Sequence, residues 1–413
     1  MRGHVTVNAI AGDAELQNVL SRAGELVSLV SKVAARLEER WDASSGLLDR
    51  MCAHALVPSG KLFRPILLLE SALAVGGDAE QVLPAAIGAE CGHTASLVHD
   101  DIIDDDDLRR GRPSVQHKYG VDNAIVAGDA LIFALFAALA ECRATGVPPD
   151  RIVAALDVVA RCGIDLCRGQ SLESELCRRM DFDVDAYLTM VKLKTAALFR
   201  GACECGALLA GGDDSMVRAL GTYAENLGTA FQIHDDLRSY TRNTEVMGKP
   251  DTSDIRNRRP TLPVLLAYES GDPVDRRAIK DVLSGDGDPV TRRDSLVKIL
   301  EQTGALSAAY ARGGQYVDNS VAALQPLPPS ASRERLRGYA EAAIGPRGER
   351  REAMEPHCDR RSGAVAAVLG SSHEPSATPA DEPVRPAGHS RHSAGRAGDE
   401  GQVPGVPVSH HGR

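Results

Sequence analysis

Apolar residues recur every three or four positions along most of the first 344 residues, which is the spacing of one face of an α-helix. Alternating patterns typical of half-buried strands are scarce. Glycine- and proline-rich stretches separate the periodic segments. The sequence therefore predicts an all-α fold, a bundle of long helices around one apolar core. The long helices are expected at 16–40, 79–105, 124–142, 152–177, 185–209 and 216–238.

The composition changes at residue 345. Residues 345–413 contain 10 Gly, 8 Pro and 6 of the 12 His, but neither Lys nor an aromatic residue. Such a segment buries too little apolar surface to offset the entropy lost on ordering. We expect a flexible N-terminus at 1–14, one folded domain at 15–344 and a disordered tail at 345–413. A His-rich metal-binding tail and a short helix near 364–369 are the alternatives for the last segment.

Charge and cysteine content narrow the class of protein. The net charge of −10 argues against a general nucleic-acid binder, because such domains are usually basic. The nine cysteines include no CxxC pair, which favours buried thiols in a reducing cytosol over a zinc site. No secretory signal is visible, and the most apolar stretch, 130–140, is shorter than the roughly 20 residues that span a bilayer. We expect a cytoplasmic protein without a transmembrane segment.

Six aspartates crowd into residues 100–107, at the end of a predicted helix. Their charges repel one another and oppose the helix dipole, so the cluster is costly unless a cation binds there. Asp100 and Asp104 are one helical turn apart and Asp101 flanks them, an arrangement of hard oxygen ligands that suits Mg²⁺. A solvated acidic loop is the alternative for this run taken alone.

A second acidic pair, Asp235 and Asp236, follows about 135 residues later. Basic residues trail both pairs, and a further basic element lies upstream at 60–65. This pattern indicates two walls of one site, in which carboxylates hold metal ions, the metals hold a polyphosphate, and Lys and Arg neutralise the remaining charge.

Together these motifs resemble the trans-isoprenyl diphosphate synthases, also called polyprenyl synthetases, over roughly residues 25–344. The first acidic motif resembles the family's DDxxD, and Arg109–Gly111 resembles the Arg-Arg-Gly that follows it. The other elements occur in the family's order: GKxxRP at 60–65, ExxH at 90–93, GD at 128–129, GQ at 169–170 and KT at 194–195. The resemblance implies an all-α bundle around a deep central apolar cavity, and a homodimer.

The resemblance also implies roles for individual residues. The Mg²⁺ ligands would be Asp100, Asp101, Asp104, Asp235 and Asp236. The allylic diphosphate would contact Arg109, Lys194, Thr195, Gln232, Lys249 and Arg259, of which Lys194 and Lys249 would take part in catalysis with the aspartates. Isopentenyl diphosphate would bind Lys61, Arg64, His93 and Arg110.

Two positions depart from the family pattern. Ser239 replaces the third aspartate of the second motif, which removes one carboxylate from that wall. Arg259 stands where the family usually has Lys; it keeps the charge but presents a planar fork. We retain the enzyme interpretation because Asp235 is present.

In the reaction that the resemblance implies, the allylic C–O bond breaks, the double bond of isopentenyl diphosphate attacks the resulting cation, and a proton is lost. An apolar cavity below the aspartates would exclude water and measure the product. Helical turns back from Asp100 reach Ser96 and Gly92, with Ala95 beside them, and all are small. Phe133 and Phe136 are candidates for the residues that close the cavity and so limit the length of the product. We expect geranylgeranyl diphosphate (C20), with a C25–C50 chain as the alternative.

Three other functions were weighed. A class I terpene cyclase would not need the second diphosphate site that Lys61, Arg64, His93 and Arg110 imply. A non-catalytic subunit of a heteromeric synthase would be expected to lose aspartates of the first motif, which are all present. A purely metal-binding or structural protein explains none of the Lys and Arg positions.

Overall fold

The computed structural model describes residues 24–241, 253–285 and 287–344. The predicted N-terminal segment 1–14, the predicted tail 345–413 and Lys249 lie outside these residues.

Five of the long helices predicted from periodicity are present within a few residues of the expected bounds, and the segment expected at 185–209 contains one π-helical turn. The helix expected at 16–40 is present from residue 24, and its predicted start at 16–23 lies outside the described residues. The long helices are α2 (Gly24–Arg40), α5 (Leu83–Asp104), α7 (Val121–Glu141), α8 (Pro149–Arg179), α9 (Val184–Val191) continued by η2 (Lys192–Ala196) and α10 (Ala197–Ala210), and α11 (Asp214–Thr241). The all-α prediction is therefore confirmed.

Shorter elements complete the described fold. The helices among them are α3 (Leu47–Leu56), α4 (Phe63–Ala74), α6 (Val115–Tyr119), α13 (Ser253–Arg256), α14 (Leu262–Ser270), α15 (Pro273–Ser284), α16 (Pro289–Gln302), α17 (Ala305–Ala323) and α18 (Ala331–Ala342). One small hairpin, β1 (Leu108–Arg109) and β2 (Arg112–Pro113), follows the end of α5.

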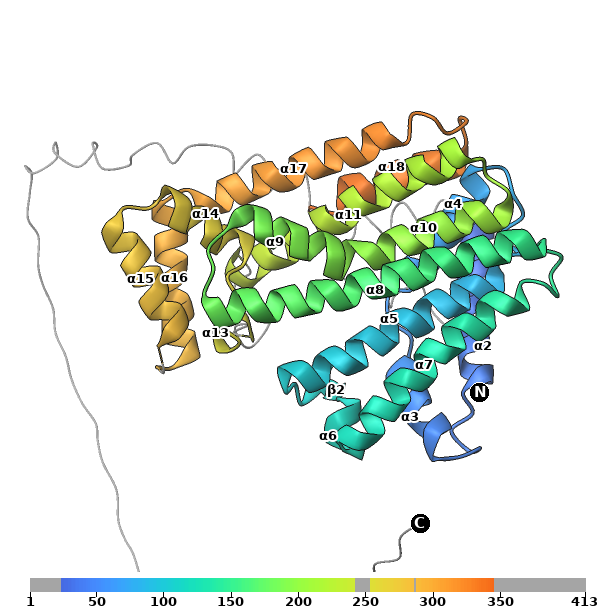
Figure 1. Cartoon of the computed structure of the whole chain (residues 1–413), viewed down its shortest axis with the longest axis horizontal. Coiled ribbons are helices and arrows are strands. Elements are labelled where there is room, and N and C mark those ends of the chain that lie inside the picture. The colour runs from blue at the N-terminus through green and yellow to red at the C-terminus, as the bar shows by residue number, and fades with distance from the viewer. Residues whose placement is uncertain (1–23, 242–252, 286, 345–413) are drawn as a thin grey trace, which may run out of the picture. The chain divides into compact units, whose positions relative to one another are not determined.

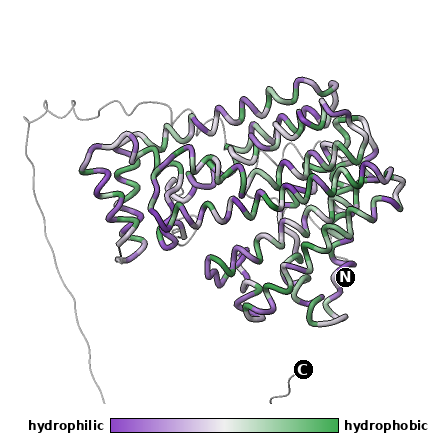
Figure 2. The backbone as a smooth tube through the Cα atoms, viewed as in Figure 1, coloured by the Kyte–Doolittle hydropathy of each residue, from purple (hydrophilic) through white to green (hydrophobic). Residues whose placement is uncertain are grey.

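The main core lies between the long helices. Helix α5 packs along α7, and α10 packs against α4, α8 and α11, while α17 lies along α11 (Figure 1). Hydrophobic and hydrophilic residues alternate along most of these helices (Figure 2), as expected for amphipathic helices that share one core. A second, smaller core lies among helices α13, α14, α15 and α16. The two acidic motifs lie on α5 and α11, on elements far apart in sequence.

A buried ion pair anchors α18, the last described helix. Arg335 Nε donates to Glu70 Oε1 at 2.5 Å and Nη2 donates to Oε2 at 2.9 Å. The Tyr339 hydroxyl donates to the same carboxylate at 3.0 Å, and the Glu70 side chain is fully buried. Because charged hydrogen bonds are strong in a dry interior, this contact holds α18 against α4, the helix that begins beside Arg64.

Helix α7 is longer than the apolar stretch at 130–140 that the sequence analysis singled out. Its 21 residues are long and apolar enough to cross a membrane, by length and composition only, and a third of the most apolar window is buried in the protein. It packs against α5 through Gly128, Leu135 and Ala138, as a core helix of a globular domain does. Several large apolar residues on its other side are exposed.

Candidate active site

A cavity of about 470 Å³ lies between the C-terminal part of α5 and helices α8, η2 and α11. It brings together most of the side chains predicted from the motifs. Those that line it are Arg64, His93, Ser96, Asp100, Asp104, Arg109, Lys194, Thr195, Gln232, Asp235, Asp236 and Arg259. Lys61, Asp101 and Arg110 lie close to this region but do not line the cavity.

Helix α5 presents Asp100 and Asp104 to the cavity, because residues four apart lie on one face. The helix ends at Asp105, which adopts a left-handed conformation (φ 53°) and turns the chain into the hairpin. Burial raises the pKa of Asp100, and the nearby Lys194 ammonium opposes that shift. The first acidic motif thus reaches a partly desolvated site where a cation is favourable.

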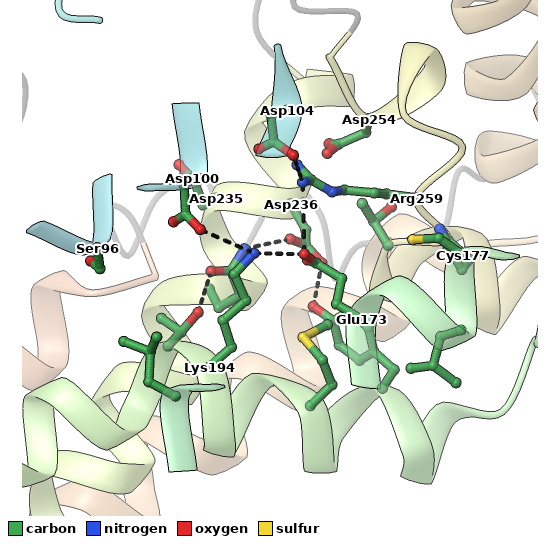
Figure 3. A pocket seen from close by; sticks show the side chains of 18 of the residues that line it. Ser96, Asp100, Asp104, Glu173, Cys177, Lys194, Asp235, Asp236, Asp254 and Arg259 are labelled. Atoms are coloured by element: carbon green, nitrogen blue, oxygen red, sulfur yellow. Dashed lines mark hydrogen bonds and ion pairs between the residues drawn. The ribbon is translucent and has the colours of Figure 1, made fainter. Parts of the chain in front are cut away.

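The charges of the two walls are paired across the cavity (Figure 3). Lys194 Nζ lies 2.6 Å from Glu173 Oε2 and 3.9 Å from Asp100 Oδ1. Arg259 bonds Asp104 and lies 3.7 Å from the same Glu173 oxygen. Glu173 is therefore at the centre of this ion-pair network, since it pairs with Lys194 on η2 and with Arg259 on the loop before α14.

Sequence reasoning missed Glu173. It lies four residues after Gly169 on α8, hence on the same helical face as the predicted GQ step. That spacing is the signal that would have found it.

Lys194 projects from η2, the π-helical turn. Such turns are rare and often mark functional sites. A methyl group built on Gly169 would overlap the backbone nitrogen of Lys194, so α8 and η2 approach each other at backbone distance. Gly169 therefore sets the position of the turn that carries Lys194 and Thr195.

Two predicted metal ligands already have protein partners, Asp101 through one carboxylate oxygen and Asp236 through both. Asp101 is buried and accepts from Arg109 Nε at 2.7 Å. Asp236, 5% exposed, accepts from Tyr187, from Gln232 Nε2 at 3.0 Å and from the Leu262 amide at 3.1 Å. Burial raises the pKa of Asp236 to about 6 despite these bonds. Gln232 in turn accepts from Thr195 Oγ1 at 3.0 Å, which links the KT and second acidic motifs.

The second wall carries a carboxylate that the motif analysis did not include. Ser239, the residue in place of the third aspartate, donates from Oγ to Asp254 Oδ2 at 3.3 Å. Asp254 on α13 lines the same cavity and lies near Asp104 and Arg259 (Figure 3). The side chain of Asp235, on α11, is more than half exposed, and its Oδ1 lies 3.7 Å from Arg238 Nη1.

The basic side of the cavity surrounds Arg64 and His93. Desolvation lowers the pKa of Arg64 to about 10, so the group stays charged at neutral pH. Desolvation and the nearby Arg64, Arg110 and Arg109 hold the pKa of His93 well below its usual range. In the described structure, Arg64 Nε and His93 Nδ1 are buried without a hydrogen-bond partner. Unpaired polar atoms beside positive charge fit a site for an anion.

The donor set also fits a divalent metal in its chemistry. Asp100, Asp104, Asp235 and Asp254 all offer carboxylate oxygens to one cavity, the hard ligands that Mg²⁺ prefers. Within the described residues, no three such groups stand close enough to hold one ion as they are positioned. Lys194 and Arg259 instead pair with several of these carboxylates.

A second, apolar cavity of about 880 Å³ begins at Asp100 and continues along α5, α7, α8 and α10. Gly92, Ala95 and Ser96 line it, as predicted. The expectation for Phe133 was wrong: its side chain is 71% exposed on the far side of α7, because the helix turns Ile132, Leu135 and Phe136 toward the cavity instead.

A family model described as polyprenyl synthetase matches residues 45–300, well over half of the chain. The chain belongs to the polyprenyl synthetase family. It is a trans-prenyl diphosphate synthase, a prenyltransferase of a family that uses a divalent metal, and its isoprenoid synthase fold is the one that the motifs implied.

Curated relatives match over about two thirds or more of their own length. The short chain isoprenyl diphosphate synthase of Methanothermobacter thermautotrophicus is 35% identical over 325 residues, 78% of this chain and 98% of that protein. The geranylgeranyl diphosphate synthase of Sulfolobus acidocaldarius is 35% identical over 66% of this chain and 82% of its own. Other relatives at 33–37% identity are named for geranylfarnesyl, heptaprenyl and farnesyl products.

Solved structures agree with this assignment. The geranylgeranyl pyrophosphate synthetase of Pyrococcus horikoshii matches with a TM-score of 0.72 at 30% identity, covering 79% of this chain and 98% of that one. A polyprenyl synthase of Caulobacter crescentus, complexed with calcium and isoprenyl diphosphate, matches with a TM-score of 0.72 at 28% identity, over 80% and 98%.

We predict that Gly169→Ala displaces η2, because the added methyl group overlaps the backbone of Lys194. The variant should lose about 1–3 kcal/mol of unfolding free energy and at least tenfold in turnover. Gly163→Ala on the same helix meets no atom within 4 Å and should be neutral or stabilising by up to about 1 kcal/mol. Because Gly163 lines the apolar cavity, this variant is the control for stability and not for turnover. Urea unfolding measures the stability of both variants, and a prenyltransferase assay measures the turnover of Gly169→Ala. Equal stability of the two variants would contradict the close approach.

Proposed function

We propose that the protein condenses isopentenyl diphosphate with an allylic diphosphate in a Mg²⁺-dependent reaction, with all-trans geranylgeranyl diphosphate (C20) as the main product. One observation carries this proposal. The charged cavity, lined by both carboxylates and cations, adjoins the apolar cavity, and the two share Arg64, Ser96 and Asp100 in their linings. A diphosphate fits the first and a growing prenyl chain fits the second.

We assign the metal ligands to Asp100 and Asp104 on one wall and Asp235 on the other. Asp254, held by Ser239, supplies the carboxylate that the second motif lacks. Asp101 orients Arg109 through Oδ1 and remains a candidate ligand through its other oxygen, whereas both oxygens of Asp236 are bonded, so that Asp236 orients Gln232. The chemistry that Mg²⁺ supplies when bound is neutralisation of the diphosphate charge that builds up as the C–O bond breaks.

The cations of the charged cavity take the remaining charge of the allylic diphosphate. Lys194 and Arg259 are held in place by Glu173, so they are oriented toward the cavity before a substrate enters. Preorganised cations stabilise a developing anion without the cost of reorganisation. Arg109, Thr195, Gln232 and Lys249 complete the predicted contacts.

The isopentenyl diphosphate site comprises Arg64, His93, Lys61 and Arg110. Neutral His93 can donate one ring N–H to a phosphate oxygen, and the Arg64 guanidinium offers its unpaired Nε–H. This second cationic site distinguishes a condensing enzyme from a terpene cyclase, which needs only one diphosphate.

The apolar cavity supports a product longer than C15. From Asp100 to Ala85, which also lines it, the axis of α5 rises about 22 Å. Gly92, Ala95 and Ser96 leave that path open, and Leu139 and Phe136 line the α7 side. Relatives of similar identity are named for products from farnesyl to heptaprenyl. We favour C20, with C25–C50 as the alternative.

We further propose a cytoplasmic homodimer that pairs through α7. Val121, Ile125, Val126, Ile132 and Phe133 expose 36–71% of their surface along this helix, and Ile132 also lines the apolar cavity. A contiguous apolar face of this kind favours a protein partner. All eight described cysteines are free thiols, which suits a reducing compartment.

The product assay tests the proposed function. Purified protein with Mg²⁺, isopentenyl diphosphate and C5, C10 or C15 allylic diphosphates should yield mainly the C20 alcohol after dephosphorylation, sized by mass spectrometry. EDTA should abolish the reaction and added Mg²⁺ should restore it. Diphosphate release without consumption of isopentenyl diphosphate would indicate a cyclase instead, and no reaction at all would favour a non-catalytic subunit.

Ala95→Phe should shorten the main product by at least one isoprene unit, because the ring would enter the apolar cavity one helical turn before Asp100 and Asp101. Val153→Phe on α8, exposed and away from the cavity, is the matched control and should leave the product unchanged. Chain lengths of the dephosphorylated products decide the question. An unchanged product from Ala95→Phe would show that this cavity does not hold the chain.

Phe133→Asp should convert the proposed dimer to monomer, since it places a charge on the exposed apolar face of α7. Val274→Asp, equally exposed on α15, should leave the mass unchanged. Size-exclusion chromatography with light scattering gives the mass of each variant. A wild-type monomer, or a Phe133→Asp dimer of undiminished stability, would refute pairing through α7.

A further inference from the structure

We propose that Arg112 and His54 form a clamp that positions the β1–β2 hairpin against the loop before α4, and that this clamp sets the affinity for isopentenyl diphosphate. The two residues touch neither diphosphate in the proposed function, on which this inference rests; they act through Arg110 and Lys61. No motif considered above includes either residue.

Arg112 bridges the two segments directly. Its Nη1 donates to the Val57 carbonyl at 2.6 Å, and its Nη2 donates to His54 Nδ1 at 2.9 Å. Val57 directly follows α3 and lies four residues before Lys61. The planar guanidinium uses two of its fixed donors on two partners, which defines an orientation as well as a distance.

His54 completes the bridge from the other side. Its Nε2 lies 2.8 Å from the Pro113 carbonyl, which can only accept, so Nε2 carries the proton. Its Nδ1 lies 2.9 Å from Arg112 Nη2 and 3.3 Å from Lys118 Nζ. Both of these groups can only donate, so Nδ1 accepts. The imidazole is therefore neutral, in one tautomer, with both nitrogens bonded. Desolvation and these two cations lower the pKa of His54, in agreement with that geometry.

The hairpin needs such support because it is short. Each strand has two residues, with Arg109 opposite Arg112 and Leu108 opposite Pro113. Isolated pairs of this size are not stable in water. The turn between them is Arg110 and Gly111, both in the left-handed region at φ 54° and 73°.

The clamp matters for the site because like charges meet at its far side. The Arg110 guanidinium lies directly over Gly60, so closely that a methyl group built there would overlap it. Lys61 is the next residue, and Arg64 lies on the first turn of α4. The buried Glu90 carboxylate offsets part of the charge of Arg64 and Arg110. The hydrogen bonds of Arg112 and His54 add a directional contact that holds the hairpin against the other segment where these like charges repel one another.

Arg109 responds differently from Arg110, although both lie on the hairpin. It has its own anchor in the buried Asp101, through Nε at 2.7 Å. Loss of the clamp should therefore displace Arg110 relative to Lys61 and leave Arg109, on the allylic side, in place. The inference thus predicts a selective effect on one substrate.

The test compares Arg112→Met with Arg50→Met, an exposed arginine on the same helix as His54. Arg112→Met should raise KM for isopentenyl diphosphate about tenfold and leave KM for the allylic diphosphate and kcat within about twofold. His54→Phe should change the two KM values and kcat in the same way. Arg112→Lys keeps the positive charge and can donate to one of the two partners, so it should recover part of the loss. Arg50→Met should match wild type.

Calorimetric titration with isopentenyl diphosphate alone measures the same affinity without turnover and should show the same tenfold weakening. Thermal unfolding identifies a variant that has lost its fold, in which case the milder Arg112→Lys decides. Equal losses for both substrates, or unchanged KM in folded Arg112→Met and His54→Phe, would overturn the clamp. An inactive wild-type protein would instead contradict the proposed function, and normal binding of isopentenyl diphosphate to it would still allow the clamp to be tested.

Discussion

The concentration of opposite charges at a partly desolvated cavity is the constraint on which the rest of this structure depends. Carboxylates on α5 and α8 face cations on η2 and before α14, and Glu173 joins Lys194 to Arg259. Either set alone would be strongly repulsive in this environment, because charges interact more strongly where water is excluded. Pairing keeps both sets charged and oriented, and leaves them ready to exchange partners for a diphosphate and its metals.

The same helices build the two halves of the site. Helix α5 presents carboxylates at its C-terminal end and small residues along the turns before it, so the charged and apolar cavities adjoin at Asp100. In the proposed function, chemistry and product length are thereby separated along one helix. The proposed isopentenyl diphosphate site is built from other elements, since Arg64 lies on the first turn of α4 and Arg110 belongs to the hairpin.

Much of this could be predicted from the sequence, and the errors have physical causes. Long helices and ordered motifs are local signals, so the helices were predicted close to their described bounds, and most of the motif side chains line one cavity. Phe133 was misplaced because periodicity tells which residues share a face, but not which face points inward. Glu173 and Asp254 were missed because each acts through partners distant in sequence, and Asp101 and Asp236 looked like free ligands because their hydrogen-bond donors come from other elements.

The fold class, the family and the inventory of charged groups can be read from the amino-acid sequence, because periodicity and motif order are properties of the chain. The tertiary fold is needed to learn which carboxylates face the cavity, which accept internal hydrogen bonds, and how Arg112 and His54 join two segments. This is so because a side chain's role depends on its desolvation and on its partners. Both are set by packing between helices that the sequence order does not bring together.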